Sequence, residues 1–260
     1  MSVGLIPAGR RAGILSEVKE KGFASVEELS DKFDVSVITI RRDLDILETE
    51  GEIERTHGGA IYSHQIKTES SYIEKNMQNH EVKAAIGSAA SKLVEHGETV
   101  FVNSGSTTYQ IIKHLFNIPK IRIITNNITA VQNIDAPLDC ELIFVGGLYR
   151  FNSGCTVGNF AYSLIEKLNV SKTFIGADGI SLKNGITSPV EEEAAITRKM
   201  IEHTLGDVIV AADSSKVGLV STFYTASLEK IDYLVTDSNF DETYRPDFVK
   251  SGIKIIKAEK

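Results

Sequence analysis

The stretch DVSVITIRRDLDIL, residues 34–47, has the pattern of a short amphipathic helix that carries two adjacent arginines. At about 100° per residue its apolar side chains cluster on one side. These side chains are Val37, Ile40, Leu44 and Leu47. Arg42 then points almost opposite, with Ile38 and Asp45 beside it. Because the apolar side is predicted to face a core, Arg42 and its neighbour Arg41 are left free to meet a polyanionic partner.

Two further helices are predicted before this stretch. RRAGILSEVKEKG, residues 10–22, places its apolar side chains on one stripe and ends at a glycine. Ser25 and Glu28 have the S-x-x-E spacing of a capping box, so a second helix begins just after Ser25. Asp34 can adopt the left-handed backbone of a tight turn, and Ser36 can cap the third helix. This order of elements is the layout of a helix-turn-helix.

The residues after the third helix predict a β-hairpin. In EIERTHGGAIYS, residues 52–63, Ile53 and Arg55 alternate as in a strand, and the two glycines suit a tight turn before a returning strand. A hairpin directly after the third helix is a wing, and Arg55 and His57 on it could reach DNA phosphates. The alternative is a small helical bundle whose charged face is merely solvated. The order of the predicted elements, namely two helices, a third helix after a tight turn and then a hairpin, favours the winged helix-turn-helix.

These residues closely resemble the N-terminal signature of the DeoR family of bacterial transcriptional repressors. The resemblance lies in the stretch SVEELSDKFDVSVITIRRDLDILETEGEIERTHGGAI, which starts at Ser25. It implies that residues 25–44 form the helix-turn-helix proper and that the partner is double-stranded operator DNA. It also implies that four residues meet that DNA, namely Ser36, Thr39, Arg41 and Arg42. The family often has glycine where this chain has Asp34, a change that the turn tolerates.

The overall composition limits the class of protein. The chain has 260 residues, 42% of them hydrophobic, which is enough for one or two domains with a sizeable core. Its net charge is −7, and the first 62 residues hold 8 Lys and Arg against 12 Asp and Glu. A DNA binder usually has a dominant basic footprint, so any contact with DNA must come from a local patch.

No segment predicts a membrane span, a signal peptide or a metal site. The apolar runs are too short for a bilayer, and no apolar core follows the basic residues near the N-terminus. The two cysteines, Cys140 and Cys155, have no metal-ligand spacing and make no disulfide framework. We therefore expect a soluble cytoplasmic protein that holds no metal and no cofactor.

The rest of the chain predicts a parallel α/β domain. Residues 63–80 are polar, have no strong period and are expected to be a linker with a short helix at most. Residues 81–97 form an Ala-rich helical pattern that stops at a glycine. Short apolar runs then alternate with helical patterns, which is typical of a sheet covered on both faces. The expected strands are 99–103, 121–125, 141–146, 172–177, 207–212, 232–236 and 253–258.

The loop after the first of these strands has the composition of an anion cradle. NSGSTT, residues 103–108, precedes a helix and offers hydroxyls and free N–H groups at the helix N-terminus. It lacks the Lys of a nucleotide-binding P-loop and the glycines of a dinucleotide fingerprint. A phosphate monoester is therefore the best fit, and a simple helix cap is the alternative. The candidate residues are Asn103, Ser104, Gly105, Ser106, Thr107 and Thr108.

Polar residues also follow the other expected strands, where ligands of parallel sheets bind. Asp178 and Asp213 could accept hydrogen bonds from sugar hydroxyls. Arg150 and Lys216 could add positive charge near a phosphate. Two further candidates are Asn126 and Gly147. Each taken alone could be a turn residue or a surface charge, but their repeated placement at strand ends favours one site.

This half of the chain also resembles the DeoR family, in its C-terminal effector domain. The shared motifs are NSGSTT, TNN, GG, GADG, EEAA and ADSSK, in this order. The resemblance implies a sugar-phosphate-binding domain related to ribose-5-phosphate isomerase and used as a sensor. Asn103 stands where the family usually has Asp, so the identity of the effector cannot be copied from a relative.

Three classes of function remain to be compared. A sugar-phosphate isomerase with an accessory DNA-binding domain would need a general base, which Glu191, Glu192 or Glu193 could supply. These acidic residues are more simply explained as the first turn of a helix. A pure scaffold leaves the cradle unexplained. We therefore predict a non-catalytic regulator.

The predicted regulator, most simply a repressor of a sugar-metabolism operon, is controlled by a phosphorylated sugar. It has a winged helix in 1–62, a linker in 63–80 and an effector domain in 81–260. A homo-oligomer, a dimer or tetramer, is expected because such repressors pair two DNA-binding domains across a two-fold axis.

Overall fold

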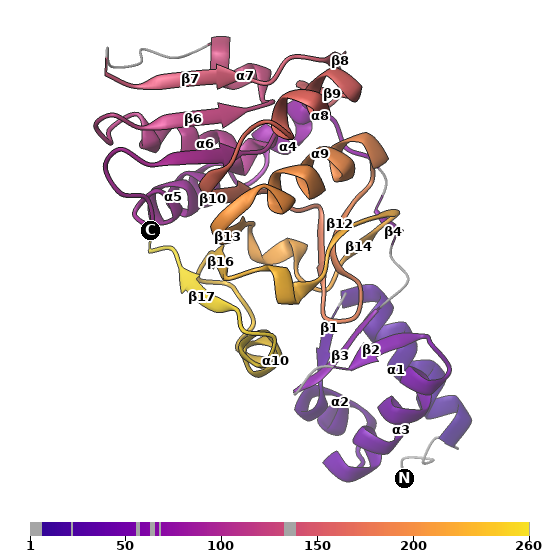
Figure 1. The fold of residues 1–260 in the computed structure, drawn as a ribbon. Helices are drawn as coiled ribbons and strands as arrows, with labels where there is room; N and C mark the ends of the chain where they lie inside the picture. The colour runs from indigo at the N-terminus through magenta and orange to yellow at the C-terminus, as the bar shows by residue number, and fades with distance from the viewer. Residues whose placement is uncertain are drawn as a thin grey trace.

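The computed structural model describes residues 7–21, 23–55, 58–62, 66–67, 69–132 and 139–259. Within these, a winged helix forms one end of the molecule and a larger α/β domain forms the rest (Figure 1). The elements of the winged helix are α1 (Pro7–Lys21), β1 (Phe23–Ser25), α2 (Val26–Phe33), α3 (Val37–Thr49), β2 (Ile53–Arg55) and β3 (Gly59–Tyr62). The strands pair antiparallel in the order β1-β3-β2. The helix-turn-helix and the wing predicted from the sequence are thereby confirmed.

Local chemistry fixes the boundaries of α2 and α3. The Ser25 side chain accepts a hydrogen bond from the Glu28 backbone N–H, and the Glu28 side chain accepts one from the Ser25 N–H. Asp34 ends α2 in the left-handed conformation with φ of 52°, as the turn requires. Ser36 then caps α3. The apolar side of α3 is buried in one cluster with α1, α2 and β3, which makes the winged helix a packed unit.

Seven strands of the described chain form the parallel sheet of the larger domain. In sheet order they are β17 (Lys254–Lys257), β16 (Tyr233–Thr236), β13 (Thr204–Ala211), β10 (Val170–Ile175), β5 (Thr99–Val102), β6 (Arg122–Thr125) and β7 (Glu141–Phe144). Every neighbouring pair is parallel. The direction of the strand order changes between β5 and β10. The chain adds β6 and β7 on one side of β5, and then β13, β16 and β17 on the other side of β10. Such a switch point opens a crevice at the carboxyl ends of the strands.

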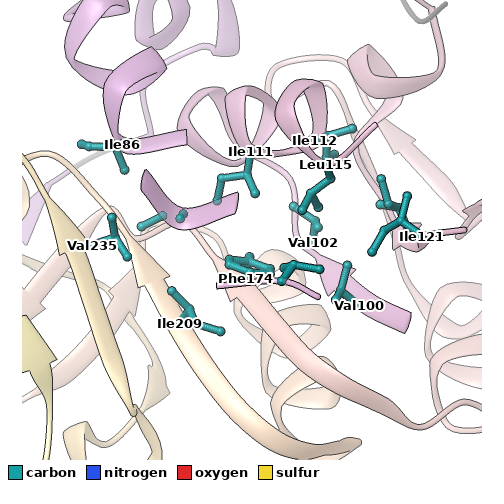
Figure 2. Packing of buried hydrophobic residues seen from close by; sticks show 14 of the residues in the cluster. Ile86, Val100, Val102, Ile111, Ile112, Leu115, Ile121, Phe174, Ile209 and Val235 are labelled. Carbon is teal, nitrogen blue, oxygen red and sulfur yellow. The ribbon is translucent and has the colours of Figure 1, made fainter. Parts of the chain in front are cut away.

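Helices cover both faces of this sheet, as continuous apolar strands require. The helices are α5 (His80–Ser91), α6 (Ser106–Leu115), α7 (Ile128–Gln132), α8 (Asn159–Ile165), α9 (Glu191–Glu202) and α10 (Arg245–Lys250). Figure 2 shows Ile86 of α5 and Ile111 of α6 packed over Val102 and Phe174. Phe101 and Ile124, which alternate along their strands with Val102 and Ile123, instead join α8 and α9 in another cluster. The sheet is therefore buried on both sides.

Shorter strands that the sequence did not predict surround the carboxyl end of the sheet. They are β8 (Leu148–Arg150), β9 (Cys155–Val157), β11 (Gly179–Ser181), β12 (Gly185–Ser188), β14 (Val220–Ser221) and β15 (Phe223–Ala226). The short helices η1 (Ser214–Lys216), η2 (Leu228–Lys230) and η3 (Glu242–Tyr244) join the later elements. β11, β12 and β15 form a small antiparallel sheet.

The segment expected to be a linker is built into the surface of the larger domain. Its strand β4 (Ile66–Lys67) pairs with β14, and its short helix α4 (Tyr72–Met77) follows. The Tyr72 backbone N–H donates to the Asn152 carbonyl at 2.7 Å. The winged helix also contacts the larger domain directly, since the rings of Phe23 and Tyr244 lie 5.9 Å apart.

Candidate functional site

The outer face of α3 carries two arginines that no described side chain neutralises. Ser36 caps the helix by accepting from the Thr39 backbone N–H at 3.3 Å, and the two hydroxyls lie 2.9 Å apart. Arg41 and Arg42 are exposed. Among the described residues neither forms a recorded ion pair. This leaves both guanidinium groups available to an external polyanion.

The acidic residues of the same helix are paired internally. Asp43 is buried and its Oδ2 accepts from Arg10 Nε of α1 at 2.5 Å. Asp45 Oδ1 lies 2.7 Å from Arg55 Nη1, which also donates to the Arg41 carbonyl at 2.8 Å. The carboxylates of Asp43 and Asp45 thus have cationic partners within the domain, whereas the exposed Arg41 and Arg42 have no recorded acidic partner among the described residues.

Arg55 lies on the wing strand β2, as predicted, but its guanidinium already has partners within the domain. We expected it to reach a DNA phosphate, but its guanidinium ties the wing strand β2 to α3 through Asp45 and the Arg41 carbonyl. We carry it forward as a group that positions the wing. His57, also expected on the wing, lies outside the described residues.

A pocket opens at the switch point of the sheet, at the carboxyl ends of β5 and β10. Its empty volume is about 930 Å³ when the part open to solvent is included. Most of the predicted effector residues line it, namely Asn103, Ser104, Gly105, Ser106, Thr107, Asp178, Asp213 and Lys216. The structure therefore brings together residues that are more than a hundred positions apart in the sequence.

The loop before α6 turns its polar groups toward this pocket. The N–H groups of the first helical turn have no partner within the helix. The hydroxyls of Ser106 and Thr107 line the pocket, and neither has a recorded hydrogen bond to another described residue. Gly105 has a φ of 150°, and its carbonyl accepts from Thr108 Oγ1 and from Asn127 Nδ2, each at 3.2 Å. These two bonds fix the position of the Gly105 carbonyl at the start of α6.

Asn103 locks the two strands of the switch point together. Its Oδ1 accepts from the Gly176 backbone N–H at 2.9 Å, and its Nδ2 donates to Thr197 Oγ1 at 3.1 Å. One amide thus connects the end of β5 to the end of β10 and to α9. An aspartate here could also keep both contacts, because the Thr197 hydroxyl can donate to a carboxylate as well as accept from an amide.

Three lysines line the pocket in different electrostatic states. Lys75 Nζ lies 2.6 Å from Asp178 Oδ1. Lys83 is buried and donates to the carbonyls of Lys75 and Gln78, and burial lowers the pKa of its ammonium group. Lys216 has no recorded partner among the described residues. It is therefore the pocket lysine whose charge is most available to an anion.

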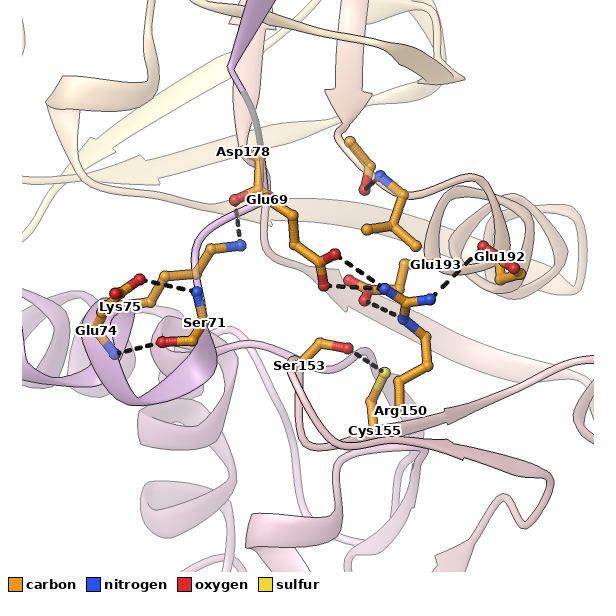
Figure 3. Close-up of polar contacts among 12 residues, drawn as sticks. Glu69, Ser71, Glu74, Lys75, Arg150, Ser153, Cys155, Asp178, Glu192 and Glu193 are labelled. Carbon is orange, nitrogen blue, oxygen red and sulfur yellow. Dashed lines mark hydrogen bonds and ion pairs between the residues drawn. The ribbon is translucent and has the colours of Figure 1, made fainter.

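Glu193, which lines another wall of the pocket, belongs to a half-buried network of carboxylates around Arg150 (Figure 3). Glu193 Oε1 lies 3.3 Å from Arg150 Nε, and Arg150 Nη2 donates to both Glu69 oxygens at 2.9 and 3.0 Å. Burial raises the pKa of the Glu193 carboxyl, although Ser153 and nearby cations oppose this. The neighbouring Cys155 thiol is also buried, which raises its pKa to about 11 and makes it unreactive.

Some predicted effector residues do not line the pocket, and each has a structural explanation. Thr108 is buried and supports Gly105. Asn126 donates to the Thr156 carbonyl at 2.9 Å and joins β6 to β9. Arg150 is held by Glu69, Glu192 and Glu193 behind the wall. Gly147 lies against the backbone of β9. These four residues therefore support the pocket and are not expected to contact a ligand.

Gly147 gives a test of this reassignment. A Cβ atom there would lie 2.5 Å from the Val157 carbonyl oxygen, so Gly147→Ala should cost about 1–3 kcal/mol of unfolding free energy through overpacking. Gly146→Ala is the matched control, because a methyl group added there would have no neighbouring atom within 4 Å. Thermal unfolding should separate the two variants by several degrees. Equal melting temperatures would contradict the close approach.

Several lining residues were missed by the sequence analysis. Tyr72, Lys75, Gln78 and Asn79 come from the expected linker. Others are Lys83, Ser153, Thr187, Ser188, Thr197, Ser215 and Thr225. Glu193 was considered as a possible general base or as part of a helix start, but not as a residue that lines the pocket. The described residues contain no group of His, Cys, Asp and Glu side chains that could hold a metal ion, and none of their helices has the length and apolar character of a membrane span.

A winged helix with two exposed arginines on α3, joined to an α/β domain with a polar pocket at its switch point, has the architecture of a DNA-binding transcription regulator with a sensor domain. Residues 10–66 match the family model of the DeoR-like helix-turn-helix domain, and residues 78–238 match that of the DeoR C terminal sensor domain. The chain belongs to the DeoR family.

Relatives of similar length align with this chain across both domains. The HTH-type transcriptional regulator GlpR of Haloferax volcanii is 34% identical over 97% of this chain and 98% of its own. The transcriptional repressor AccR of Agrobacterium fabrum is 32% identical over 88% of this chain and 89% of its own. A solved D-ribose-5-phosphate isomerase in complex with phospho-erythronic acid aligns with 17% identity and a TM-score of 0.39, over 54% of this chain and 55% of that one.

Proposed function

We propose that this regulator is a repressor of a sugar-metabolism operon and that a phosphorylated sugar controls it from the switch-point pocket. The observation that carries the proposal is that Ser106 and Thr107 line the same pocket as Lys216, whose ammonium group has no recorded partner among the described residues. A phosphate monoester offers oxygens to the free N–H groups, to the hydroxyls and to the ammonium group. The repressor relatives support the direction of control.

The other polar groups of the pocket suit the hydroxyls of a sugar. Asp178 and Asp213 both line the pocket and are acceptors. Asp178 is paired with Lys75, and Asp213 is buried with its Oδ1 bonded to Ser215. A ligand with an anionic end and several hydroxyls would use both kinds of group at once. An unphosphorylated sugar would leave the cradle empty.

The contacts of the segment between the two domains, which includes β4 and α4, suggest how ligand binding in the pocket would affect the DNA-binding domain. Lys75 bonds Asp178 inside the pocket, Glu69 bonds Arg150, and β4 pairs with β14 just before them in the chain. A ligand hydroxyl that donates a hydrogen bond to Asp178 would compete with Lys75 for that carboxylate and would change the packing of α4. Operator affinity would fall if the ligand binds more tightly to the arrangement that does not fit DNA.

We assign no catalytic role to the pocket. An isomerase would require a carboxylate base, and Glu193 is buried in the pocket with a raised pKa. Its Oε1 faces Arg150, however, and the chain's N-terminal domain has no use in isomerisation. Incubation of the bound sugar phosphate with the protein, followed by proton NMR, should show no interconversion, and turnover would support the isomerase alternative instead.

We further propose that the chain acts in the cytoplasm, where the operator DNA is, as a homo-oligomer. A dimer or tetramer places two α3 helices in successive major grooves of a two-fold operator. Light scattering of the full-length protein would measure the assembly, and a monomer at micromolar concentration would contradict this part of the proposal.

A thermal-shift screen of the full-length protein against phosphosugars tests the ligand class. Each phosphosugar is compared with its unphosphorylated parent. A ligand at 100 times its dissociation constant should add about 2.7 kcal/mol of stability, which is a shift of several degrees. We expect a shift that needs the phosphate.

A lysine variant sharpens the screen. Lys216→Ala should reduce the phosphate-dependent shift, whereas Lys250→Ala on the exposed face of α10 should not. A parent sugar that shifts the melting temperature as far as its phosphate would contradict the cradle. A shift that Lys216→Ala leaves intact would remove this lysine from the site.

A further inference from the structure

The outer face of α3 carries one feature that charge does not explain. Ile38 is 78% exposed, although its neighbours Val37 and Ile40 both join the apolar cluster of the winged helix. It contributes nothing to that cluster. A single exposed apolar side chain is common on protein surfaces, but Ile38 lies on the helix face that also presents Arg42 to a binding partner.

The surroundings of Ile38 indicate the size and chemistry of that partner. Arg42 lies four residues later on the same face of the helix, and Ser36 lies two residues earlier at the helix N-terminus. Ile38 is the one largely exposed large apolar side chain among the described residues of the winged helix. A protein interface would need a broader apolar patch. The partner must therefore offer one small apolar group within a polar, anionic surface.

The major groove of DNA offers such a group. The C5-methyl of thymine is the apolar contact that each A·T pair presents there, beside hydrogen-bonding edges that suit a neighbouring arginine. The N-terminal residues of a recognition helix are those that reach base edges. We propose that Ile38 contacts the C5-methyl group of a thymine in the operator and so makes α3 selective for that base at one position of each half-site.

The test removes the methyl group from the DNA. Operator sites are first selected with the full-length protein from a pool of random duplexes. Each thymine of the selected site is then replaced singly by deoxyuridine, which lacks only the C5-methyl. We expect one such position per half-site to weaken binding about fourfold, which corresponds to about 0.8 kcal/mol for one buried methyl group.

The variant Ile38→Ala completes a double-mutant cycle. It should bind the thymine-containing site about as weakly as the wild type binds the deoxyuridine site, and it should not respond to deoxyuridine at that position. Ile73→Ala is the matched control, because Ile73 on α4 is 72% exposed but lies outside the winged helix. This variant should keep the wild-type response to deoxyuridine.

Two results would overturn the proposal. One is a wild-type protein that tolerates deoxyuridine at every position. The other is an Ile38→Ala protein that keeps the full deoxyuridine penalty, which would mean that another residue senses the methyl group. The substitution removes an exposed side chain and introduces the best helix former, so an unchanged melting temperature should confirm that the variant is folded.

Discussion

Replacing Arg42 with alanine should weaken binding to the selected operator by about 1–3 kcal/mol, or roughly 5- to 150-fold. The guanidinium is exposed on the side of α3 opposite the buried Ile40 and Leu44, and no described carboxylate holds it. An arginine in this place can form a bidentate pair with guanine in the major groove. The loss should therefore be large for the operator and small for unrelated DNA. Fluorescence anisotropy with both duplexes measures the difference.

Arg41 and Arg122 serve as controls for this result. Arg41 lies on the flank of the helix, where it would contact a phosphate. Arg41→Ala should therefore weaken binding to all DNA sequences alike and lower the slope of log affinity against log salt concentration by about one. Arg122 lies on β6 and pairs with Glu141, so Arg122→Ala should leave both affinities unchanged. Unchanged operator affinity in Arg42→Ala would remove this residue from base recognition.

The double variant Ser106→Ala, Thr107→Ala should abolish the response to the phosphosugar while leaving operator binding intact. Both hydroxyls line the pocket without a recorded partner among the described residues, so their removal breaks no known internal bond. A phosphate bound at the cradle would lose two donors, each a charge-assisted hydrogen bond of about 1.5–3 kcal/mol. Their combined loss lowers ligand affinity by at least two orders of magnitude. Operator release as a function of phosphosugar concentration measures the effect.

The interpretation depends on the fold of this variant. Both residues are mostly buried, so its melting temperature must stay near that of the wild type. Ser163→Ala, an exposed change on α8, controls for the loss of a hydroxyl as such. Continued release at wild-type ligand concentrations would exclude the cradle from the control of DNA binding.

The sequence was sufficient where local chemistry decides structure. The capping box of Ser25 and Glu28 and the turn at Asp34 predicted α2 and α3 within a residue or two. The apolar runs predicted every strand of the large parallel sheet, because strands buried on both faces have to be continuously apolar. The sequence also predicted that residues 103–107 lie together at a strand end, because one loop supplies all of them.

The remaining part of the site depends on long-range packing. Lys75 reaches the pocket because β4 and α4 attach to the larger domain, and a polar segment without a period carries no local signal for that. The sequence predicted that Arg55 lies on the wing. It could not predict the ion pair of Arg55 with Asp45, because Asp45 lies on α3. Glu193 looked like a helix start, and only the packing around it reveals burial.

The attachment of residues 66–79 has a consequence for building hybrid regulators. A chimera joined at residue 81 would take Tyr72 and Lys75 from the donor of the DNA-binding domain, and the sensor would then be assembled from two unrelated parents. A junction ahead of β4 keeps the strand and the helix with the domain that they complete. The DNA-binding part that can be exchanged between regulators therefore ends before β4, and not at the end of the polar segment. A chimera joined at the end of that segment should still bind DNA but should no longer respond to the sensor's ligand.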